Sequence, residues 1–301
     1  AIGAMTMGGT CVTLPNKHYD PVEALTAIGE HGVTTVTIVG DAFARPMLEA
    51  LDTNPKGFNI QSVNVITSSG VMWTREIKAG LLTHNENLLL VDGFSSSEAI
   101  GLGSSVMTKD AQIDVAKCTI GANCRVFTED HRTINPGDNE PGLVAVKGHL
   151  PLGYYKDPEK TAKTFQYIQG ERYSVPGDWV QVESDGSLTL LGRGSNCINT
   201  AGEKVFPEEV EEALKHHEHI EDALVIGLPD PKWGQAITAV IQTRGNQPLQ
   251  SGDLKEWARS LLAAYKLPKH IFIKENLNRA PNGKADYKSI KQFAEDQLKA
   301  G

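Results

Sequence analysis

Short runs of apolar and β-branched residues alternate with helical stretches over about the first hundred residues. Residues 33–39, VTTVTIV, are nearly continuous in β-branched side chains and predict a buried strand. The alternation continues with a helix, a strand, a helix and a strand, expected at residues 46–51, 63–66, 75–82 and 88–91. This β-α-β-α-β order predicts a mostly parallel sheet with both faces covered.

The pattern changes near residue 111, where short strands are broken by turns rich in Gly, Pro, Asn and Asp. The segments NPGDNEPG at residues 135–142 and SDG at residues 184–186 are the clearest of these turns. They predict a small antiparallel barrel or half-barrel, so we expect a β-barrel subdomain beside the α/β sheet.

A compact unit of about a hundred residues follows Arg193. Its expected strands lie at residues 223–226, 237–242 and 270–274, and its expected helices at residues 208–216, 253–262 and 287–298. The predicted fold class is therefore α/β plus α+β, with the α+β domain at the C-terminal end. We predict a large domain at residues 1–193, made of a sheet at 1–110 and a β-rich part at 111–193, and a mobile C-terminal domain at 194–301.

Composition narrows the classes of function. The 301 residues are 40% hydrophobic and 22% charged, and the net charge of −8 with scattered Lys and Arg argues against nucleic-acid binding. No apolar run approaches the roughly 18 residues of a membrane span, and no signal peptide is visible. The four cysteines form no CxxC pair, which predicts reduced thiols and a cytoplasmic location. The chain opens AIGAMTMGG, which reads like the interior of a longer protein.

Two separated motifs carry the strongest chemical signal. The first is LLGRGSNCINTAGEKVFPEEVEEAL at residues 190–214, in which a strand and a polar turn lead into a helix with Pro at its first position and acids in its first turn. The second is APNGK at residues 280–284. In this order they resemble the domain-junction signature and the catalytic-lysine loop of the adenylate-forming superfamily, which includes acyl-CoA synthetases, luciferases and peptide-synthetase adenylation domains.

That resemblance implies roles for residues of the second half of the chain. Lys284 would be the catalytic lysine that bridges the carboxylate and the α-phosphate as acyl-adenylate forms, and PNG is a turn that projects it. Ser195 falls where relatives carry a hinge Asp or Lys, and a hinge needs only a few residues that absorb backbone rotation. The adjacent loop of Ala201, Gly202 and Glu203 would line the channel for the pantetheine arm of CoA.

The resemblance also extends to DGFSSSE at residues 92–98, which follows a predicted strand. Open α/β sheets bind ligands at that end of a strand. By resemblance Glu98 would hold Mg²⁺ on the nucleotide phosphates, Ser97 would contact the α-phosphate, and Phe94 would lie near adenine. Gly93 belongs to the same nucleotide-binding segment, and Asp92 is a candidate partner of the adenine amino group.

Three further residues are expected to bind nucleotide. Gly70 ends TSSG at residues 67–70, where relatives have a turn that lines the adenine pocket. Asp178, in YSVPGDW, would accept hydrogen bonds from both ribose hydroxyls, a task that suits a carboxylate. Arg193 would contact ribose or phosphate through its guanidinium fork. The cluster HHEH at residues 216–219 is a possible metal site, but charges that favour a helix C-terminus are the preferred interpretation.

The phosphate loop of the superfamily, a Ser/Thr/Gly-rich run ending in Pro-Lys-Gly, is absent from the sequence. The resemblance therefore covers the rear part of a typical enzyme, with the front portion missing or on a separate chain. We expect an acid–CoA ligase that uses ATP, Mg²⁺ and CoA on a fatty-acyl or steroid-side-chain carboxylic acid. The alternatives are a catalytically incomplete nucleotide-binding module, half of a split enzyme, or an adenylating enzyme that loads a carrier protein.

Overall fold

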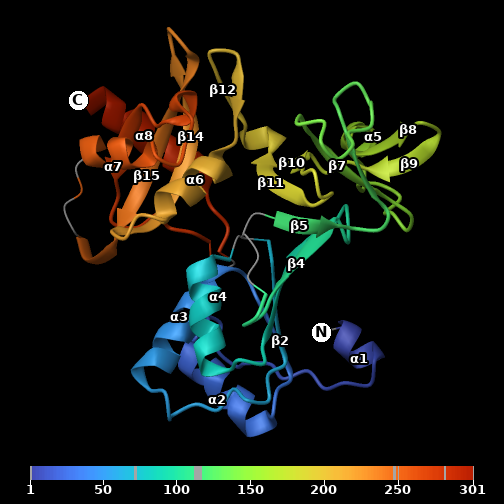
Figure 1. The fold of residues 1–301 in the computed structure, drawn as a ribbon, viewed down its shortest axis with the longest axis vertical. Helices are drawn as coiled ribbons and strands as arrows, with labels where there is room; N and C mark the ends of the chain where they lie inside the picture. The colour runs from blue at the N-terminus through green and yellow to red at the C-terminus, as the bar shows by residue number, and fades with distance from the viewer. Residues whose placement is uncertain are drawn as a thin grey trace. The chain divides into compact units, whose positions relative to one another are not determined.

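The computed structural model describes residues 2–70, 73–111, 117–246, 249, 251–280 and 283–300 (Figure 1). The chain divides into two compact units. The first holds residues 1–122 with residues 281–283, and the second holds residues 123–280 with residues 284–301. This division rests on packing alone and does not test the predicted domain limits at residues 193 and 194, which remain a prediction.

The first unit contains a mixed sheet in the order β1-β2-β3-β4-β5. Strands β1, β2 and β3 are parallel, and β4 and β5 continue the sheet in antiparallel fashion. The strand bounds are β1 Thr35–Ile38, β2 Val65–Ser69, β3 Leu89–Phe94, β4 Gly103–Met107 and β5 Lys117–Ile120. The β-α-β-α-β order predicted from the apolar runs is confirmed.

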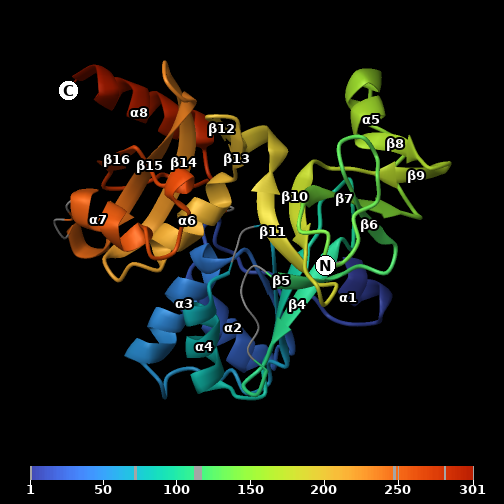
Figure 2. The same ribbon diagram turned by 45° about the horizontal axis from the view of Figure 1, so that its top comes forward.

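Helices precede and connect these strands: α1 Ile2–Thr6, α2 Pro21–His31, α3 Asp41–Thr53 and α4 Arg75–His84. Helix α2 begins where the Asp20 carboxylate accepts hydrogen bonds from the backbone of Val22 and Glu23, with Pro21 at its first position. It ends at Gly32 in the left-handed conformation, φ 59°. Helices α2, α3 and α4 lie together (Figure 2). Their apolar residues share one core with those of the sheet, in which Leu25, Met47 and Leu81 are almost fully buried.

The expectation that both faces of this sheet are covered is wrong for the first unit. Leu89 and Val106, which lie on the face away from the helices, are 42% and 38% exposed. By strand register this face carries Thr35 and Thr37 of β1 on the same side as Leu89 and Val106, so it holds apolar as well as polar side chains.

The second unit begins with antiparallel strands in the order β11-β10-β7-β9-β8, with β6 also paired to β7. Their bounds, with one short helix, are β6 Cys124–Phe127, β7 Pro141–Lys147, α5 Pro158–Thr164, β8 Phe165–Ile168, β9 Glu171–Ser174, β10 Asp178–Val182 and β11 Leu188–Arg193. The antiparallel prediction is confirmed, but the predicted barrel is not. Among the described residues of this unit no pairing joins β8 to β11, so the sheet stays open.

The rest of the second unit is the predicted α+β domain. It contains η1 Gly194–Asn196, β12 Ile198–Thr200, β13 Glu203–Val205, α6 Pro207–Lys215, β14 Ile220–Asp230, β15 Gly234–Thr243, η2 Arg244–Asn246, α7 Ser251–Ala258, η3 Ala264–Lys266, β16 His270–Ile273 and α8 Tyr287–Ala300. The long β14–β15 hairpin is central. Strand β14 pairs along one edge of β15, and β12 and β16 pair with the other edge, β12 at Gly234 and β16 at residues 238–241.

Both faces of this hairpin are buried. Ala223 and Val225 point to α6 and α7 and share a core with Val210, Leu214 and Leu254. Leu224, Ile226 and Leu228 belong to the opposite face and pack with Ile290 and Ala294 of α8. A strand covered on both faces is expected to be a continuous apolar run, which agrees with the strand predicted at residues 223–226.

The tight packing of β7 against its neighbours gives a test of this core. A methyl group at Gly142 would lie 2.4 Å from Ile134 Cδ1, 2.7 Å from Val126 Cγ1 and 2.8 Å from the Phe127 carbonyl oxygen. We expect Gly142→Ala to destabilise the chain by about 1–3 kcal/mol, which is a drop of several degrees in the melting temperature. Gly252→Ala is the control, because no atom lies within 4 Å of its added methyl. Equal melting temperatures for the two variants would contradict the packing described for β7.

Candidate functional site

The carboxyl ends of β2 and β3 bring three predicted nucleotide-binding residues together. Ser69 and Gly93 are register partners, so Gly70 follows directly beside the Gly93–Phe94 end of β3. Gly70 has φ 93°, a left-handed value that favours glycine, and nothing lies within 4 Å of the position of a Cβ there. The backbone is therefore open at the edge of the sheet where α/β folds bind ligands.

A tight turn continues from β3 and carries Ser97 and Glu98. The backbone N–H of Ser96 donates to the carbonyl of Ala99 at 2.9 Å, and the N–H of Ala99 donates back at 3.2 Å. Ser97 is exposed and Glu98 is half-buried. No group of three His, Cys, Asp or Glu residues within the described part of the chain could hold a metal ion.

Asp92 has a protein partner that the sequence did not reveal. Its carboxylate forms an ion pair with the Nζ atom of Lys78, which projects from α4. The Lys78 side chain is only 4% exposed, and its ammonium group lies 5.4 Å from the ring centre of buried Trp73. Burial raises the pKa of the Asp92 carboxyl despite the opposing charge of Lys78, and Asp41 raises it further.

The register of β10 and β11 brings Asp178 and Arg193 together in the second unit. These residues are direct register partners, and Arg193 Nε donates to Asp178 Oδ1 at 3.1 Å. The Asp178 side chain is 12% exposed, whereas the Arg193 side chain is 53% exposed. The pair therefore presents a buried acceptor and an accessible guanidinium from adjacent strands. The two residues were predicted separately, and strand pairing is what joins them.

The predicted hinge follows this pair directly. The backbone of Ser195 lies in η1, and Gly194 N–H donates to the Gly177 carbonyl at 3.0 Å. A methyl group at Gly192 would meet Glu208 Oε2 at 2.2 Å, so the first turn of α6 lies against the end of β11. Burial raises the pKa of the Glu208 carboxyl. Its hydrogen bonds with the Arg193 backbone and the Asn196 side chain act in the opposite direction and lower this pKa. Sequence reasoning assigned Glu208 only to the helix dipole and missed this contact.

The residues predicted to line the CoA channel form a two-residue hairpin turn. Ala201 and Gly202 connect β12 to β13 and have φ values of 53° and 88°. Positive φ at both central positions is typical of the type I′ turn that the twist of a hairpin favours. Ala201 N–H donates to the Trp233 carbonyl at 2.8 Å, which fixes the turn against the β14–β15 connection. Glu203 is exposed at the start of β13.

Lys284 lies in the segment between β16 and α8, and its side chain is exposed. The carbonyl of Lys284 accepts a hydrogen bond from the backbone N–H of Ala280 at 2.9 Å, which closes the turn that carries it. Pro281 and Asn282 of the PNGK motif lie outside the described residues. The predicted site residues thus divide into a set in the first unit, from Gly70 to Glu98, and a set in the second, from Asp178 to Lys284.

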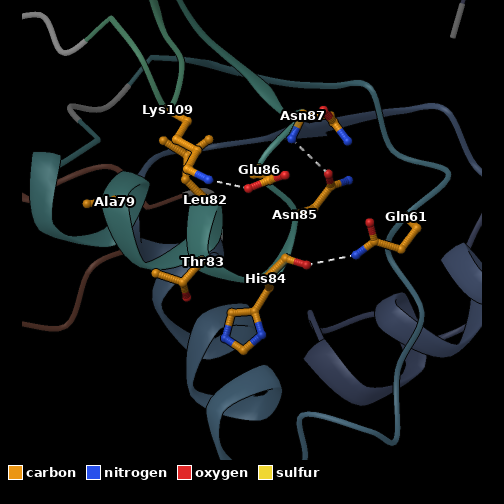
Figure 3. A pocket seen from close by; sticks show the side chains of 9 residues that line it. All are labelled: Gln61, Ala79, Leu82, Thr83, His84, Asn85, Glu86, Asn87 and Lys109. Carbon is orange, nitrogen blue, oxygen red and sulfur yellow. Dashed lines mark hydrogen bonds and ion pairs between the residues drawn. The ribbon is translucent and has the colours of Figure 1, made fainter.

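A cavity of about 450 Å³ lies elsewhere in the first unit, where α4 ends and β3 begins (Figure 3). None of the predicted site residues lines it, and it is at the amino end of β3. Its polar groups bond to one another: Gln61 donates to the His84 carbonyl, Asn87 N–H donates to the Asn85 side chain, and Lys109 pairs with Glu86. The lining is Gln61, Ala79, Leu82, Thr83, His84, Asn85, Glu86, Asn87 and Lys109.

The histidines after α6 also lie apart from the predicted site. The His217 ring packs edge-on against Trp257 at 5.0 Å, and burial lowers the pKa of its imidazole. Within the described residues the histidines do not combine with other ligands into a metal site. In the same part of the chain no helix is both long enough and apolar enough to cross a membrane.

The C-terminal part of the chain matches a known family. Residues 209–284 match the family model of the AMP-binding enzyme C-terminal domain. Over 298 residues the chain is 38% identical to a medium/long-chain-fatty-acid–CoA/3-oxocholest-4-en-26-oate–CoA ligase of Mycolicibacterium smegmatis, a match that covers 98% of this chain and 54% of that protein. A 3-oxocholest-4-en-26-oate–CoA ligase of Rhodococcus rhodochrous is also 38% identical, with 96% and 52% covered. The chain thus spans about half the length of these relatives.

Solved structures with the same fold extend the comparison. An amide bond synthetase from Marinactinospora thermotolerans superposes with a TM-score of 0.82 at 22% identity, covering 95% of this chain and 56% of that one. An o-succinylbenzoate CoA synthetase from Bacillus subtilis, in complex with an acyl-adenylate intermediate, has a TM-score of 0.77 at 22% identity, with 96% and 57% covered. The predicted fold class is confirmed, as is the resemblance to adenylate-forming enzymes.

The Lys78–Asp92 ion pair gives a prediction about stability and pH. Lys78→Met leaves the Asp92 carboxylate buried without its cation, and we expect a loss of about 3–5 kcal/mol at neutral pH. Removal of the cation raises the pKa of folded Asp92 further above its unfolded value. Stability should therefore fall as pH rises through that pKa, so the loss in melting temperature is larger at pH 8 than at pH 5. Lys109→Met, at an exposed pair with Glu86, is the matched control. A pH-independent loss would exclude Asp92 as its cause.

Proposed function

We propose that this chain, which belongs to the AMP-binding enzymes by its C-terminal domain, is part of an acid–CoA ligase that works through an acyl-adenylate. The observation that carries the proposal is the pairing of Asp178 with Arg193 at the end of β10 and β11, directly before the η1 turn. The motif order around this pair and the 38% identity to two CoA ligases support it. As the chain spans about half of those relatives, the activity is proposed for the whole protein.

We assign nucleotide contacts to residues of each unit separately, by their resemblance to the motifs of adenylate-forming enzymes. In the first unit, Gly70, Gly93 and Phe94 offer open backbone and an aromatic ring for adenine. Asp92 is proposed near the adenine amino group; its carboxylate already binds Lys78 and Ser105, and a carboxylate offers about four acceptor sites in all. In the second unit, Asp178 would accept hydrogen bonds from the ribose hydroxyls, and the exposed Arg193 guanidinium would reach ribose or phosphate.

The first reaction is proposed to join the carboxylate to AMP. A carboxylate oxygen of the acid attacks the α-phosphorus of ATP, and pyrophosphate leaves. Lys284 stabilises the negative charge that develops at the α-phosphate, and Ser97 donates a hydrogen bond to the same group. Mg²⁺, when held by Glu98 and the phosphates, would neutralise charge on the leaving pyrophosphate. The half-buried Glu98 carboxylate suits that task because it provides oxygen ligands at the turn that follows β3.

The second reaction is proposed to transfer the acyl group to CoA. The thiolate sulfur attacks the acyl carbonyl carbon, and AMP leaves with the electrons of the carbon–oxygen bond. Rotation at Ser195 would bring the hairpin turn of Ala201, Gly202 and Glu203 to the pantetheine arm. A turn without a bulky side chain at Gly202 lets a thin arm approach the backbone closely.

The names of the relatives support a substrate class. We propose a medium- or long-chain fatty acid or a steroid-side-chain carboxylic acid, because the two similar ligases carry those substrates in their names. We also propose a cytoplasmic location. No disulfide joins Cys11, Cys118, Cys124 and Cys197, as expected in a reducing compartment.

Nucleotide binding can be tested on the chain as it stands. We expect AMP to bind measurably in calorimetric titration and Asp178→Asn to weaken it about tenfold or more, because the amide NH₂ donates where two acceptor sites are needed. Asp185→Asn is the control, since that carboxylate serves a surface turn by accepting from Ser187. Equal AMP affinity of both variants would argue against the ribose role of Asp178.

The catalytic role of Lys284 is tested in the protein at its full natural length. Lys284→Ala should slow acyl-adenylate formation by about 100-fold or more, because the lost ammonium stabilises charge at phosphorus. Transfer from preformed acyl-adenylate to CoA should keep nearly its normal rate.

Lys288→Ala, an exposed lysine on α8, is the control for loss of a positive charge near the motif. Equal losses in both half-reactions would refute the specific role of Lys284. AMP binding without adenylate formation by the wild type would favour a nucleotide-binding module or a split enzyme. Thioester formation on a carrier protein but not on CoA would identify the acceptor as a carrier.

A further inference from the structure

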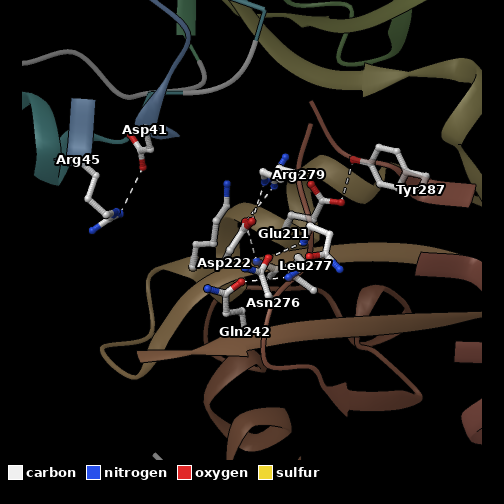
Figure 4. A network of polar contacts seen from close by, with 12 residues as sticks. Asp41, Arg45, Glu211, Asp222, Gln242, Asn276, Leu277, Arg279 and Tyr287 are labelled. Atoms are coloured by element: carbon white, nitrogen blue, oxygen red, sulfur yellow. Dashed lines mark hydrogen bonds and ion pairs between the residues drawn. The ribbon is translucent and has the colours of Figure 1, made fainter. Parts of the chain in front are cut away.

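We propose that Arg279 and Tyr287 are positioning residues that hold the loop carrying Lys284 from both sides. Arg279 is bound to Asp222 on β14, and Tyr287 is bound to Glu211 on α6. The four side chains belong to the second unit, as does Lys284, and the four are drawn in Figure 4. The inference rests on the proposed function of Lys284, but its structural part can be tested without activity.

The loop needs such support because it has no regular structure of its own. Between the end of β16 at Ile273 and the start of α8 at Tyr287, no helix or strand is present among the described residues. The bond from Ala280 N–H to the Lys284 carbonyl closes the turn internally at 2.9 Å. This bond lies within the turn, so it does not by itself fix the direction of the turn relative to the domain.

The first anchor precedes the turn. Arg279 Nε donates to Asp222 Oδ2 at 2.6 Å, and Arg279 Nη2 donates to Asp222 Oδ1 at 2.9 Å. Both side chains are mostly buried, at 23% and 19% exposure. A two-point guanidinium–carboxylate pair fixes orientation as well as distance. Two residues earlier, Leu277 is 2% exposed, and its N–H donates to the Gln242 side chain at 3.1 Å (Figure 4).

The second anchor follows the turn. The Tyr287 hydroxyl donates to Glu211 Oε1 at 3.0 Å, and the same oxygen accepts the Val225 N–H of β14 at 2.9 Å. Glu211 is 5% exposed, and burial raises the pKa of its carboxyl to about 8. The carboxylate of Asp286 then receives the Ser289 N–H at 3.1 Å and starts α8.

These anchors bracket Lys284 closely in sequence, five residues after Arg279 and three residues before Tyr287. An extended residue spans about 3.3–3.6 Å, so the lysine backbone cannot move far while both anchors hold. Both anchors are attached to well-packed elements. Asp222 and Val225 belong to β14, which is buried on both faces, and Glu211 belongs to helix α6, which packs in the same domain. Electrostatic catalysis depends on such placement, since a shift of about 1 Å can cost about 100-fold in rate.

The structural arm of the test measures hydrogen exchange at the Ala280 amide, whose bond to Lys284 opens when the turn moves. We expect exchange there to be at least about tenfold faster in Arg279→Ala and in Tyr287→Phe than in the wild type. Tyr287→Phe removes only a hydroxyl, so it covers the case in which Arg279→Ala does not fold. Arg259→Ala, at an exposed arginine next to α7, is the matched control. Unchanged exchange in folded variants of both anchors would overturn the proposal.

The catalytic arm measures the two half-reactions in the protein at its full natural length. Arg279→Ala should lower kcat of acyl-adenylate formation about 10- to 100-fold with little change in KM for ATP and little change in acyl transfer. Arg279→Lys should recover part of the loss, because it restores the charge without the two-point fork. A double variant with Asp222→Ala should lose no more than Arg279→Ala alone, as expected for one coupled pair.

Together the two experiments distinguish a failure of the positioning inference from a failure of the proposed function. If the wild type forms no adenylate but the Ala280 amide responds to both anchors, the positioning contacts stand and the assigned reaction fails. If adenylation is normal in the wild type and both half-reactions fall equally in the anchor variants, the contacts support the whole domain rather than Lys284, and the inference is wrong.

Discussion

Burial on both faces of the β14–β15 hairpin is the constraint on which the C-terminal domain depends. Ala223 and Val225 face one core, and Leu224 and Ile226 face the other, so α6 and α8 are held on opposite sides of one strand. A shift of one residue in register would exchange the two faces and break both cores. The same register fixes Asp222 and the Val225 N–H, which are the points where the flanks of the Lys284 loop attach.

Several carboxylates in this chain are withdrawn from water, and each has a defined partner. Asp178 has Arg193, Asp92 has Lys78, and Asp222 has Arg279. Such pairs are weak evidence of stability as such, since desolvation offsets much of the attraction. What they provide is orientation, because a buried pair with one good geometry limits where each side chain can point. Asp178 and Asp92, whose orientation is limited in this way, are also residues for which we propose a role in nucleotide binding.

The elements of the fold were largely predictable because their signals are local. The apolar runs gave β1, β2 and β3, and Pro207 with Glu208 and Glu209 marked the start of α6. Closure of the β-rich region was not predictable, because turns specify strand order locally but not whether β8 reaches β11. The covering of the first sheet was misjudged for a different reason. The exposed face carries Leu89 and Val106 as well as the Thr residues of β1, so the polarity of the strand sequences did not distinguish the exposed face from the buried one.

The residues of the candidate site also divide into those that local sequence predicts and those that only the fold reveals. Asp178, Arg193 and Lys284 belong to continuous motifs and could be named from the sequence, whereas the pairing of Asp178 with Arg193 and the ion pairs made by Lys78 and Asp222 could not. Lys78 lies 14 residues before Asp92, and Asp222 lies 57 residues before Arg279, so only the folded chain brings each pair together. No rule of sequence spacing detects a contact that depends on strand register and helix packing at once.

The proposed mechanism requires some side chains to keep their positions and others to move with the C-terminal domain. Asp178 and Arg193 lie on paired strands, where the register holds them at a constant separation. Ser195 lies in a three-residue η1 turn, and the hairpin of Ala201 and Gly202 has only two residues between its strands. The hinge proposed at Ser195 therefore lies at the turn that directly follows the strand pair. A rotation there would carry the C-terminal domain while Asp178 and Arg193 remain in the sheet, and Lys284 would move with the domain because the flanks of its loop are bound to β14 and α6. In the proposed reaction, such a rotation would exchange the residues that face the acyl-adenylate while the two cores of the β14–β15 hairpin stay intact, since both lie beyond the turn.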